Sequence, residues 1–174
     1  MSLTYASIAQ MKKMLDNLDA WLAKGTAHAQ SKSIEPDVLL SSRLIADMYP
    51  LLRQVQASCD TAKFAAAYLS GREAPKHPDT EQTMPELRAR IRTCLEYLET
   101  FSEADFEGAE TRWITLRFKP DKEITGQDYL TELAWPNFYF HATTAYDILR
   151  MNGVDVGKRD FMGSLNWRDR VAGS

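Results

Sequence analysis

Hydrophobic residues recur every three or four positions along four stretches of the chain, a spacing typical of helices that bury one face. The first stretch begins at Thr4, a residue suited to capping a helix, and ends near Gly25. Its apolar positions are Ile8, Met11, Leu15, Leu18 and Leu22. This spacing predicts one amphipathic helix.

The second stretch predicts a long helix. Pro36 suits a first helical turn and Gly71 a helix end, so the helix would span about 34 residues and roughly 50 Å. Its apolar positions are Leu40, Leu44, Met48, Leu51, Val55, Cys59, Ala62, Ala66 and Leu69.

A capping-box pattern starts the third helix. Thr83 is the expected cap and Glu86 the residue that reaches back to it, and the apolar spacing continues to Phe101. The period then changes, because residues 112–118 are rich in β-branched and aromatic residues and are followed by a turn signal around Pro120. A short hairpin of 112–118 with 122–125 is predicted.

The fourth helix is expected to follow Gly126 and to end at Met151-Asn152-Gly153. Its face is formed by Leu130, Ala134, Asn137, His141, Ala145 and Ile148. These patterns predict an all-α four-helix bundle, with a long second helix and a β-hairpin between helices 3 and 4. Residues 1–174 would form a single domain, with 154–174 an irregular tail packed on it through Phe161 and Trp167.

Composition narrows the class of protein. A net charge of -3 and a pI near 5.6 provide no basic field, so neither nucleic acid nor a membrane is an expected partner. The N-terminus has no secretory signal, which points to a cytoplasmic protein. Cys59 and Cys94 lie among apolar residues, and two buried free thiols are favoured over a disulfide. Walker, GxGxxG, HExxH and GxSxG motifs are absent from the sequence.

The chain has only three histidines, and one of them lies on an apolar helix face. Asn137 and His141 are one turn apart on the fourth helix, and Asp47 borders the apolar stripe of the second. His28 and His77 are expected in solvent. Two interpretations of the polar set remain: a core histidine hydrogen-bonded to Asp47, or a pocket in which Asp47 orients His141 as a general base or imidazole ligand.

Two neighbouring features leave similar alternatives open. Pro50 and Pro136 fall inside helical patterns, where they free the carbonyls of Ala46 and Glu132. Such kinks either open space for a ligand or fit a helix to its neighbours. The aromatic residues around His141 would either pack in the core and a subunit interface or form the wall of a ligand site; they are Trp135, Phe138, Tyr139, Phe140 and Tyr146.

Several segments resemble a known family. The element order, the stretch Asn137–His141 and the helix end at 149–153 are similar to the DinB-like superfamily of four-helix bundles. The segments 47–50, 54–63 and 157–161 resemble one of its branches, a bacterial domain of unknown function. The resemblance covers nearly the whole chain.

The resemblance implies a metal site in the wider superfamily. There the last helix carries His-x-x-His-His and the second helix a further histidine, which bind nickel or zinc and in some members activate a small thiol. The last-helix histidines correspond to Asn137, Phe140 and His141, and Asp47 is the candidate on the second helix. Because this set lacks two of three strong ligands, no cofactor is expected beyond a weakly bound divalent metal, nickel or zinc.

The sequence thus predicts a DinB-like bundle whose degenerate metal-type pocket, formed by Asp47, Asn137 and His141, acts on or binds a small organic or thiol ligand. Whether it is an enzyme stays open. The alternative is a non-catalytic dimeric scaffold or small-molecule binder that has lost its metal. A homodimer is expected from the resemblance and from the spare aromatic residues.

Overall fold

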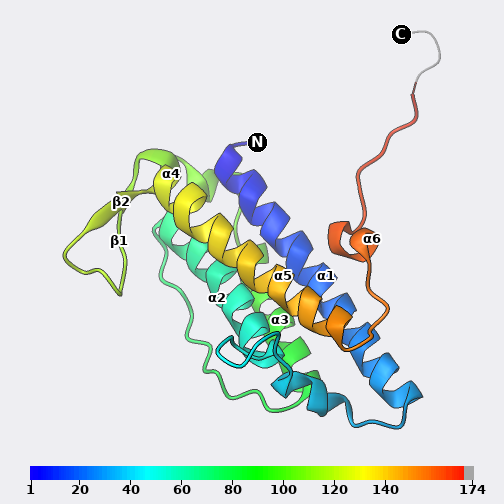
Figure 1. The fold of residues 1–174 in the computed structure, drawn as a ribbon. Helices are drawn as coiled ribbons and strands as arrows, with labels where there is room; N and C mark the ends of the chain where they lie inside the picture. The colour runs from blue at the N-terminus through cyan, green and yellow to red at the C-terminus, as the bar shows by residue number, and fades with distance from the viewer. Residues whose placement is uncertain (171–174) are drawn as a thin grey trace.

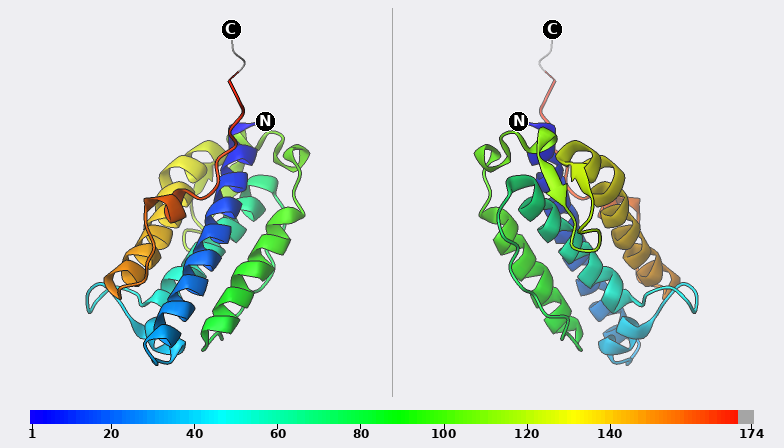
Figure 2. Two further views of the ribbon diagram at one scale, coloured as in Figure 1. Left: turned by 90° about the vertical axis from the view of Figure 1, so that its right-hand side faces the viewer. Right: turned by 90° about the vertical axis from the view of Figure 1, so that its left-hand side faces the viewer.

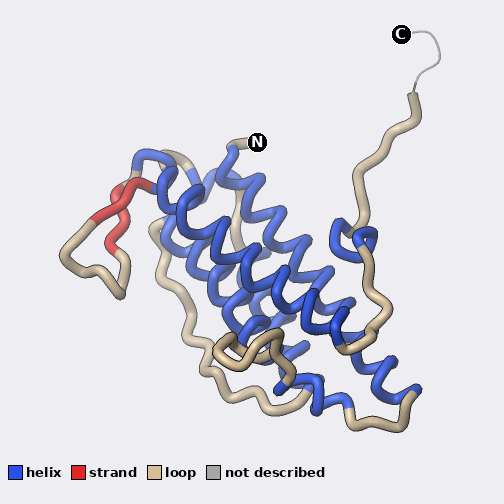
Figure 3. Tube along the Cα trace, in the orientation of Figure 1, coloured by secondary structure: helices blue, strands red, loops and turns tan. Residues whose placement is uncertain are grey.

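The computed structural model describes residues 1–170 and is mostly helical, with one two-stranded antiparallel sheet at one end (Figures 1 and 3). Its four longest helices are α1 (Leu3–Ser31), α2 (Leu51–Ser70), α3 (Met84–Glu99) and α5 (Trp135–Met151). Helix α2 packs against α3 and α5, and α1 packs against the same two helices. One hydrophobic core therefore lies between the four helices.

Shorter elements connect the long helices. They are η1 (Pro36–Ser41), η2 (Glu103–Phe106), η3 (Ala109–Thr111), α4 (Gly126–Asp128), η4 (Tyr129–Ala134), α6 (Lys158–Met162) and the strands β1 (Trp113–Thr115) and β2 (Glu123–Thr125). No helix within residues 1–170 is both long and apolar enough to cross a bilayer.

Helix α1 follows the predicted apolar face but differs at both ends. Ser2 is the cap and accepts a hydrogen bond from the Tyr5 amide at 3.2 Å, whereas Thr4 is buried and donates to Glu110 at 3.0 Å. The helix continues past Gly25 to Ser31. Gly25 is buried where Leu149 packs, and a Cβ there would lie 3.2 Å from the Leu149 side chain. Gly25 therefore serves close helix packing rather than termination.

The long second helix was a wrong prediction. Residues 36–41 form the separate 3-10 helix η1, and α2 begins only after Pro50, which caps it. Between them the chain turns through an exposed segment in which Leu44 and Ile45 are 38% and 60% exposed. The reason is steric, because proline disfavours helical backbone at the residue before it and lacks an N–H of its own. The predicted apolar positions from Leu51 onward are buried.

The capping box of α3 and the hairpin are confirmed. Thr83 accepts from the Glu86 amide at 3.3 Å and Glu86 accepts from the Thr83 amide at 3.1 Å. The strands are shorter than predicted, and Ile114 pairs with Ile124 at their centre. Figure 2 shows the hairpin beside the helices, near the start of α4. Residues 116–118 of the hairpin turn line a common cavity with residues of α2 and η4.

The last helix runs from Gly126 to Met151 with a change of winding. Residues Tyr129–Ala134 form a π-helix, in which the Trp135 amide donates to the Leu130 carbonyl. Pro136, which has no amide hydrogen, is the second residue of the following helix α5. A π-helical segment is one way in which a helix adjusts its hydrogen bonds around such a break, and such segments are frequent at functional sites.

Residues 154–170 agree only in part with the irregular tail expected from the sequence. Gly153 ends α5 with a φ of 83°, and residues 158–162 then form the short helix α6. Phe161 stacks on the buried Trp21 with a centroid distance of 5.3 Å, so this part of the tail lies against the core. Trp167 is 84% exposed, so its predicted packing was wrong. Residues 171–174 of the predicted tail lie outside the described residues.

The two cysteines are buried free thiols, as predicted. They lie where α2 and α3 pack, and the Cys94 thiol donates a hydrogen bond to the Cys59 carbonyl oxygen at 3.3 Å. A hydrogen bond with Cys94 and complete burial raise the pKa of the Cys59 thiol well above its usual range. Cys59 is therefore not poised as a nucleophile.

Candidate ligand-binding site

The polar residues of α5 pair with residues of α2 rather than with Asp47. The Nδ1 atom of His141 lies 2.7 Å from Gln54 Oε1. Asp47 lies in the turn before Pro50 and is exposed. The α2 partner of His141 in this structure is thus Gln54, and Asp47 is not on a helix.

The hydrogen bonds of Gln54 determine the tautomer of His141. The Gln54 amide nitrogen donates to the Tyr49 carbonyl at 3.0 Å, so its Oε1 atom faces the imidazole as an acceptor. His141 Nδ1 must therefore carry the proton, and Nε2 keeps its lone pair.

The surroundings keep His141 neutral. Burial lowers the pKa of its imidazole, and the nearby Arg53 guanidinium lowers it further. Gln54 offers no charge that would stabilise an imidazolium, whereas an aspartate would. His141 is therefore a neutral, oriented imidazole at pH 7.

Asn137 forms a second pair one turn earlier. Its Nδ2 donates to Thr61 Oγ1 at 2.7 Å, and Thr61 donates in turn to the Ala57 carbonyl at 2.7 Å. Because the Thr61 hydroxyl proton is already used, only the NH2 end of Asn137 can face it. The Asn137 side-chain carbonyl is left as a free acceptor within the described part of the chain.

These residues do not form a set that suits a nickel or zinc ion. Within residues 1–170 no group of three or more histidine, cysteine or carboxylate side chains is placed to hold a metal. The hydrogen-bond partner of His141 is the neutral Gln54, whose side-chain oxygen is engaged by the imidazole ring. Zinc prefers imidazole, thiolate or carboxylate ligands, so the donor set at α2 and α5 does not fit the metal implied by the resemblance.

A surface cavity of about 450 Å³ opens next to the Asn137–Thr61 pair. Its volume falls within the range of small-molecule sites. The walls come from α2, from the π-helix η4, from the hairpin turn and from Asp79 in the loop before α3; the aromatic and apolar residues among them are Ala57, Phe64, Tyr68, Leu116, Phe118, Tyr129, Leu133 and Ala134.

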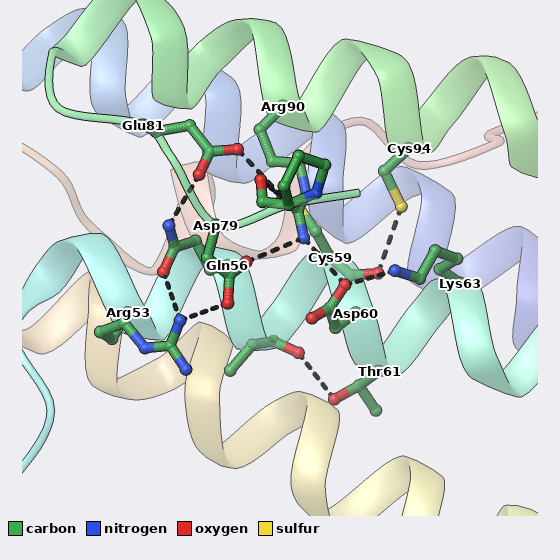
Figure 4. Close-up of polar contacts among 12 residues, drawn as sticks. Arg53, Gln56, Cys59, Asp60, Thr61, Lys63, Asp79, Glu81, Arg90 and Cys94 are labelled. Atoms are coloured by element: carbon green, nitrogen blue, oxygen red, sulfur yellow. Dashed lines mark hydrogen bonds and ion pairs between the residues drawn. The ribbon is translucent and has the colours of Figure 1, made fainter. Parts of the chain in front are cut away.

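The charged wall of this cavity continues into a buried network, which Figure 4 shows between α2, α3 and the segment before α3. The side chain of Arg90 is 3% exposed and lies 2.9 Å from Asp60, 3.3 Å from Asp79 and 3.0 Å from Glu81. Lys63, equally buried, lies 2.7 Å from Asp60. This network ties the loop carrying Asp79 to α2.

Arg53 also lines the cavity. It forms an ion pair with Asp79 and donates a hydrogen bond to Gln56 at 2.9 Å. Gln56 in turn donates to Glu81 at 2.7 Å. Burial alone would lower the pKa of Arg90, but Asp60 and Glu81 outweigh it and the pKa is raised. The Arg90 guanidinium therefore keeps its positive charge at pH 7.

His77, expected in solvent, is half-buried against this network. Burial lowers the pKa of its imidazole, as do Lys63 and Arg90, and its buried Nδ1 has no hydrogen-bond partner within the described residues. His28 is also half-buried, near Gly153 at the end of α5.

The sequence left two alternatives open for the aromatic residues around His141, packing or a ligand wall. Phe138 is buried and Phe140 is 54% exposed, and neither lines the cavity. The aromatic side chains of the cavity are Phe64, Tyr68, Phe118 and Tyr129. The spacing of Phe64 and Tyr68, four residues apart on α2, was the signal that could have identified this face.

Comparisons with known proteins agree with this fold. The chain resembles the crystal structure of a DinB family member from Shewanella denitrificans, with 50% sequence identity, a TM-score of 0.92 and 95% of each chain covered. A family model described as a domain of unknown function (DUF1993) matches residues 3–162, and the chain belongs to this family. No curated protein gave a significant match. The predicted resemblance is thereby confirmed.

Proposed function

We propose that this protein binds a small organic molecule in the cavity between α2, η4 and the hairpin, without a resident metal ion. The observation that carries the proposal is the cavity itself, about 450 Å³ in volume, with aromatic walls and a few fixed polar groups. This is the composition that small-molecule sites commonly have.

The position of the cavity supports the same proposal. Three of its wall residues, Tyr129, Leu133 and Ala134, belong to the π-helix, a form of backbone that is frequent at functional sites. The side-chain carbonyl of Asn137 adds a hydrogen-bond acceptor, and the hydrogen bond from the Asn137 amide nitrogen to Thr61 fixes its orientation. A ligand would therefore meet a wall that is already arranged before binding.

A cavity-filling variant tests the proposal. Ala57 lines the cavity and is half-buried, so Ala57→Leu is expected to fill the space while α2 still folds. Small aromatic fragments should shift NMR signals of α2 and η4 in the native protein and not in Ala57→Leu. Ala89→Leu, at an exposed position of α3, is the matched control and should bind like the native protein. Equal binding by native protein and Ala57→Leu would refute the proposal.

Catalysis by His141 is the second candidate, and the free lone pair on its Nε2 atom favours it. An oriented neutral imidazole is suited to act as a general base on a small organic or thiol substrate. Metal analysis of protein purified without an affinity tag separates this candidate from that of a metalloenzyme. We expect less than stoichiometric nickel and zinc, whereas a stoichiometric metal that His141→Ala removes would restore the metalloenzyme interpretation.

We further infer that α1, α2, α3 and α5 form the four-helix bundle expected from the sequence. Their mutual packing around one core supports this arrangement. The two free thiols, Cys59 and Cys94, support a reducing compartment such as the cytoplasm. The exposed Phe140 on α5 supports the expected homodimer.

A further inference from the structure

We infer that the ligand of this cavity is a flat organic acid, and that Arg117 is the residue that binds its carboxylate. The inference rests on the proposed function and specifies its ligand class. The charged side chains that line the cavity already form ion pairs, except for Arg117, which forms none among the described residues.

Arg117 is the cation at this wall without a carboxylate. Within residues 1–170 it forms no ion pair, and its guanidinium lies over the Phe64 ring at 5.3 Å. Stacking on an aromatic ring leaves the edge of a guanidinium, with its N–H donors, able to bind a carboxylate with two hydrogen bonds. Arg117 is therefore a positioned and unused anion binder.

The other charges of the wall are paired among themselves. Asp79 contacts both Arg53 and Arg90, and Asp60 contacts both Lys63 and Arg90. The two carboxylates thus share three cations, and their negative charges are already balanced before an anionic ligand enters the cavity.

Arg117 adds a positive charge beside a balanced network. The network pairs the three cations Arg53, Lys63 and Arg90 with the three carboxylates of Asp60, Asp79 and Glu81, and Arg117 is the fourth cation. One added carboxylate balances the charge. Lys63 also lies over Phe64, at 4.5 Å, so two cations border the ring against which a ligand would pack.

The rest of the wall suits a flat, largely apolar body. Phe64, Tyr68 and Tyr129 line the cavity, and the two tyrosine rings meet edge to face at 5.5 Å. Burial raises the pKa of Tyr129, so its phenol stays neutral and does not repel an anion. The side-chain carbonyl of Asn137 would accept a hydrogen bond from an N–H or O–H group of the same ligand.

A series of probes that differ in charge tests the ligand class. Indole-3-acetate, indole-3-acetamide and tryptamine share a flat ring with an N–H donor and are anionic, neutral and cationic at pH 7. Dissociation constants are measured from NMR titrations of the full chain, which also show where each probe binds. We expect the acid to bind at least about tenfold more tightly than the amide, and tryptamine to bind most weakly. Added salt should weaken binding of the acid more than that of the amide.

Two matched variants assign the effect to Arg117. Arg117→Gln should bring the acid-to-amide ratio close to one and leave binding of the amide unchanged. Lys119→Gln removes a charge from the same hairpin turn at an exposed position that does not line the cavity, and it should keep the ratio of the native protein.

The outcomes separate this inference from the proposed function. Equal binding of acid and amide at the cavity, or a preference for the acid that survives Arg117→Gln, overturns the ligand class and leaves the binding function standing. Failure of all three probes to shift signals of α2, η4 and the hairpin at millimolar concentration overturns both.

Discussion

At the scale of single residues, the chemistry depends on neutral hydrogen-bonding partners. Gln54 holds His141 in one tautomer, and Thr61 holds Asn137 in one orientation. The side chains of Gln54 and Thr61 are both uncharged. The pairs therefore position groups without activating them strongly, which suits binding better than acid–base chemistry.

Replacing Gln54 by a carboxylate tests this role. In Gln54→Glu, the negative charge next to Nδ1 should stabilise the imidazolium and raise the pKa of His141 above its value in the native protein. The pKa is measured by NMR titration of the imidazole protons, which His141→Gln assigns. An unchanged or lower pKa in Gln54→Glu would contradict the hydrogen bond described for these residues.

The lowered pKa values of His141 and His77 predict how stability depends on pH. Between the folded-state pKa and the unfolded value near 6.5, the unfolded chain binds more protons, so the free energy of unfolding falls as the pH falls through this window. In His141→Gln the loss between about pH 7.5 and about pH 5.5 should be smaller than in the native protein.

Urea unfolding at both pH values measures the effect. His77→Gln should also reduce the loss, and the double variant should reduce it most. An equal loss in the native protein and in both single variants would show that these imidazoles are not the groups that titrate.

The sequence predicted part of this residue-level picture. The spacing of Asn137 and His141 was enough to place them one turn apart on α5. Gln54 escaped notice because a neutral amide carries no signature of a metal or catalytic site. Asp47 was chosen because the apolar period of residues 36–70 was extended through Pro50, where the helix actually begins.

At the scale of elements, the charged network connects α2, α3 and the loop before α3. Arg90 is its centre, and the partners of its guanidinium come from α2 and from that loop. The loop residue Asp79 is also part of the cavity wall. The shape of the cavity on this side therefore depends on Arg90.

Arg90→Met should destabilise the protein because it leaves Asp60, Asp79 and Glu81 without their buried partner. We expect a loss of about 2–3 kcal/mol in the free energy of unfolding, since these carboxylates are only partly buried. Arg88→Met is the control on the same helix, where the Asp19 pair is more exposed, and about 1 kcal/mol is expected. Equal losses in urea unfolding would contradict the central role of Arg90.

Local signals predicted most elements, and long-range packing decided the rest. The capping box of Thr83 and the turn around Pro120 have local causes, so α3 and the hairpin follow from the sequence. In the π-helix, Tyr129 and Leu130 are buried and Tyr129 packs on Tyr68 of α2, and the apolar period around Pro136 does not reveal this change of winding. The cavity wall combines α2, η4 and the hairpin, whose proximity only the fold establishes.

At the scale of the whole molecule, the fold is that of a DinB family member and the site differs from the metal site that the resemblance implies. The same face of α2 and α5 carries amide, hydroxyl and imidazole groups, next to a cavity with aromatic walls. This arrangement agrees with the proposed binding of a small organic molecule without a resident metal ion.

The expected homodimer is tested by light scattering coupled to size exclusion. The native protein should have twice the chain mass of 19.8 kDa, because the exposed Phe140 offers an apolar contact on α5. Phe140→Ser should shift the particle to the mass of one chain. A native particle of 19.8 kDa would rule out the homodimer.

Crystals of the native protein soaked with a set of small aromatic acids and their amides test the central claim most directly. The account predicts a ring against Phe64 and Tyr129, with the carboxylate of each acid on Arg117 and no metal ion between ligand and protein. Fragments bound only elsewhere on the surface, with the cavity open to them and free of ligand, would contradict it.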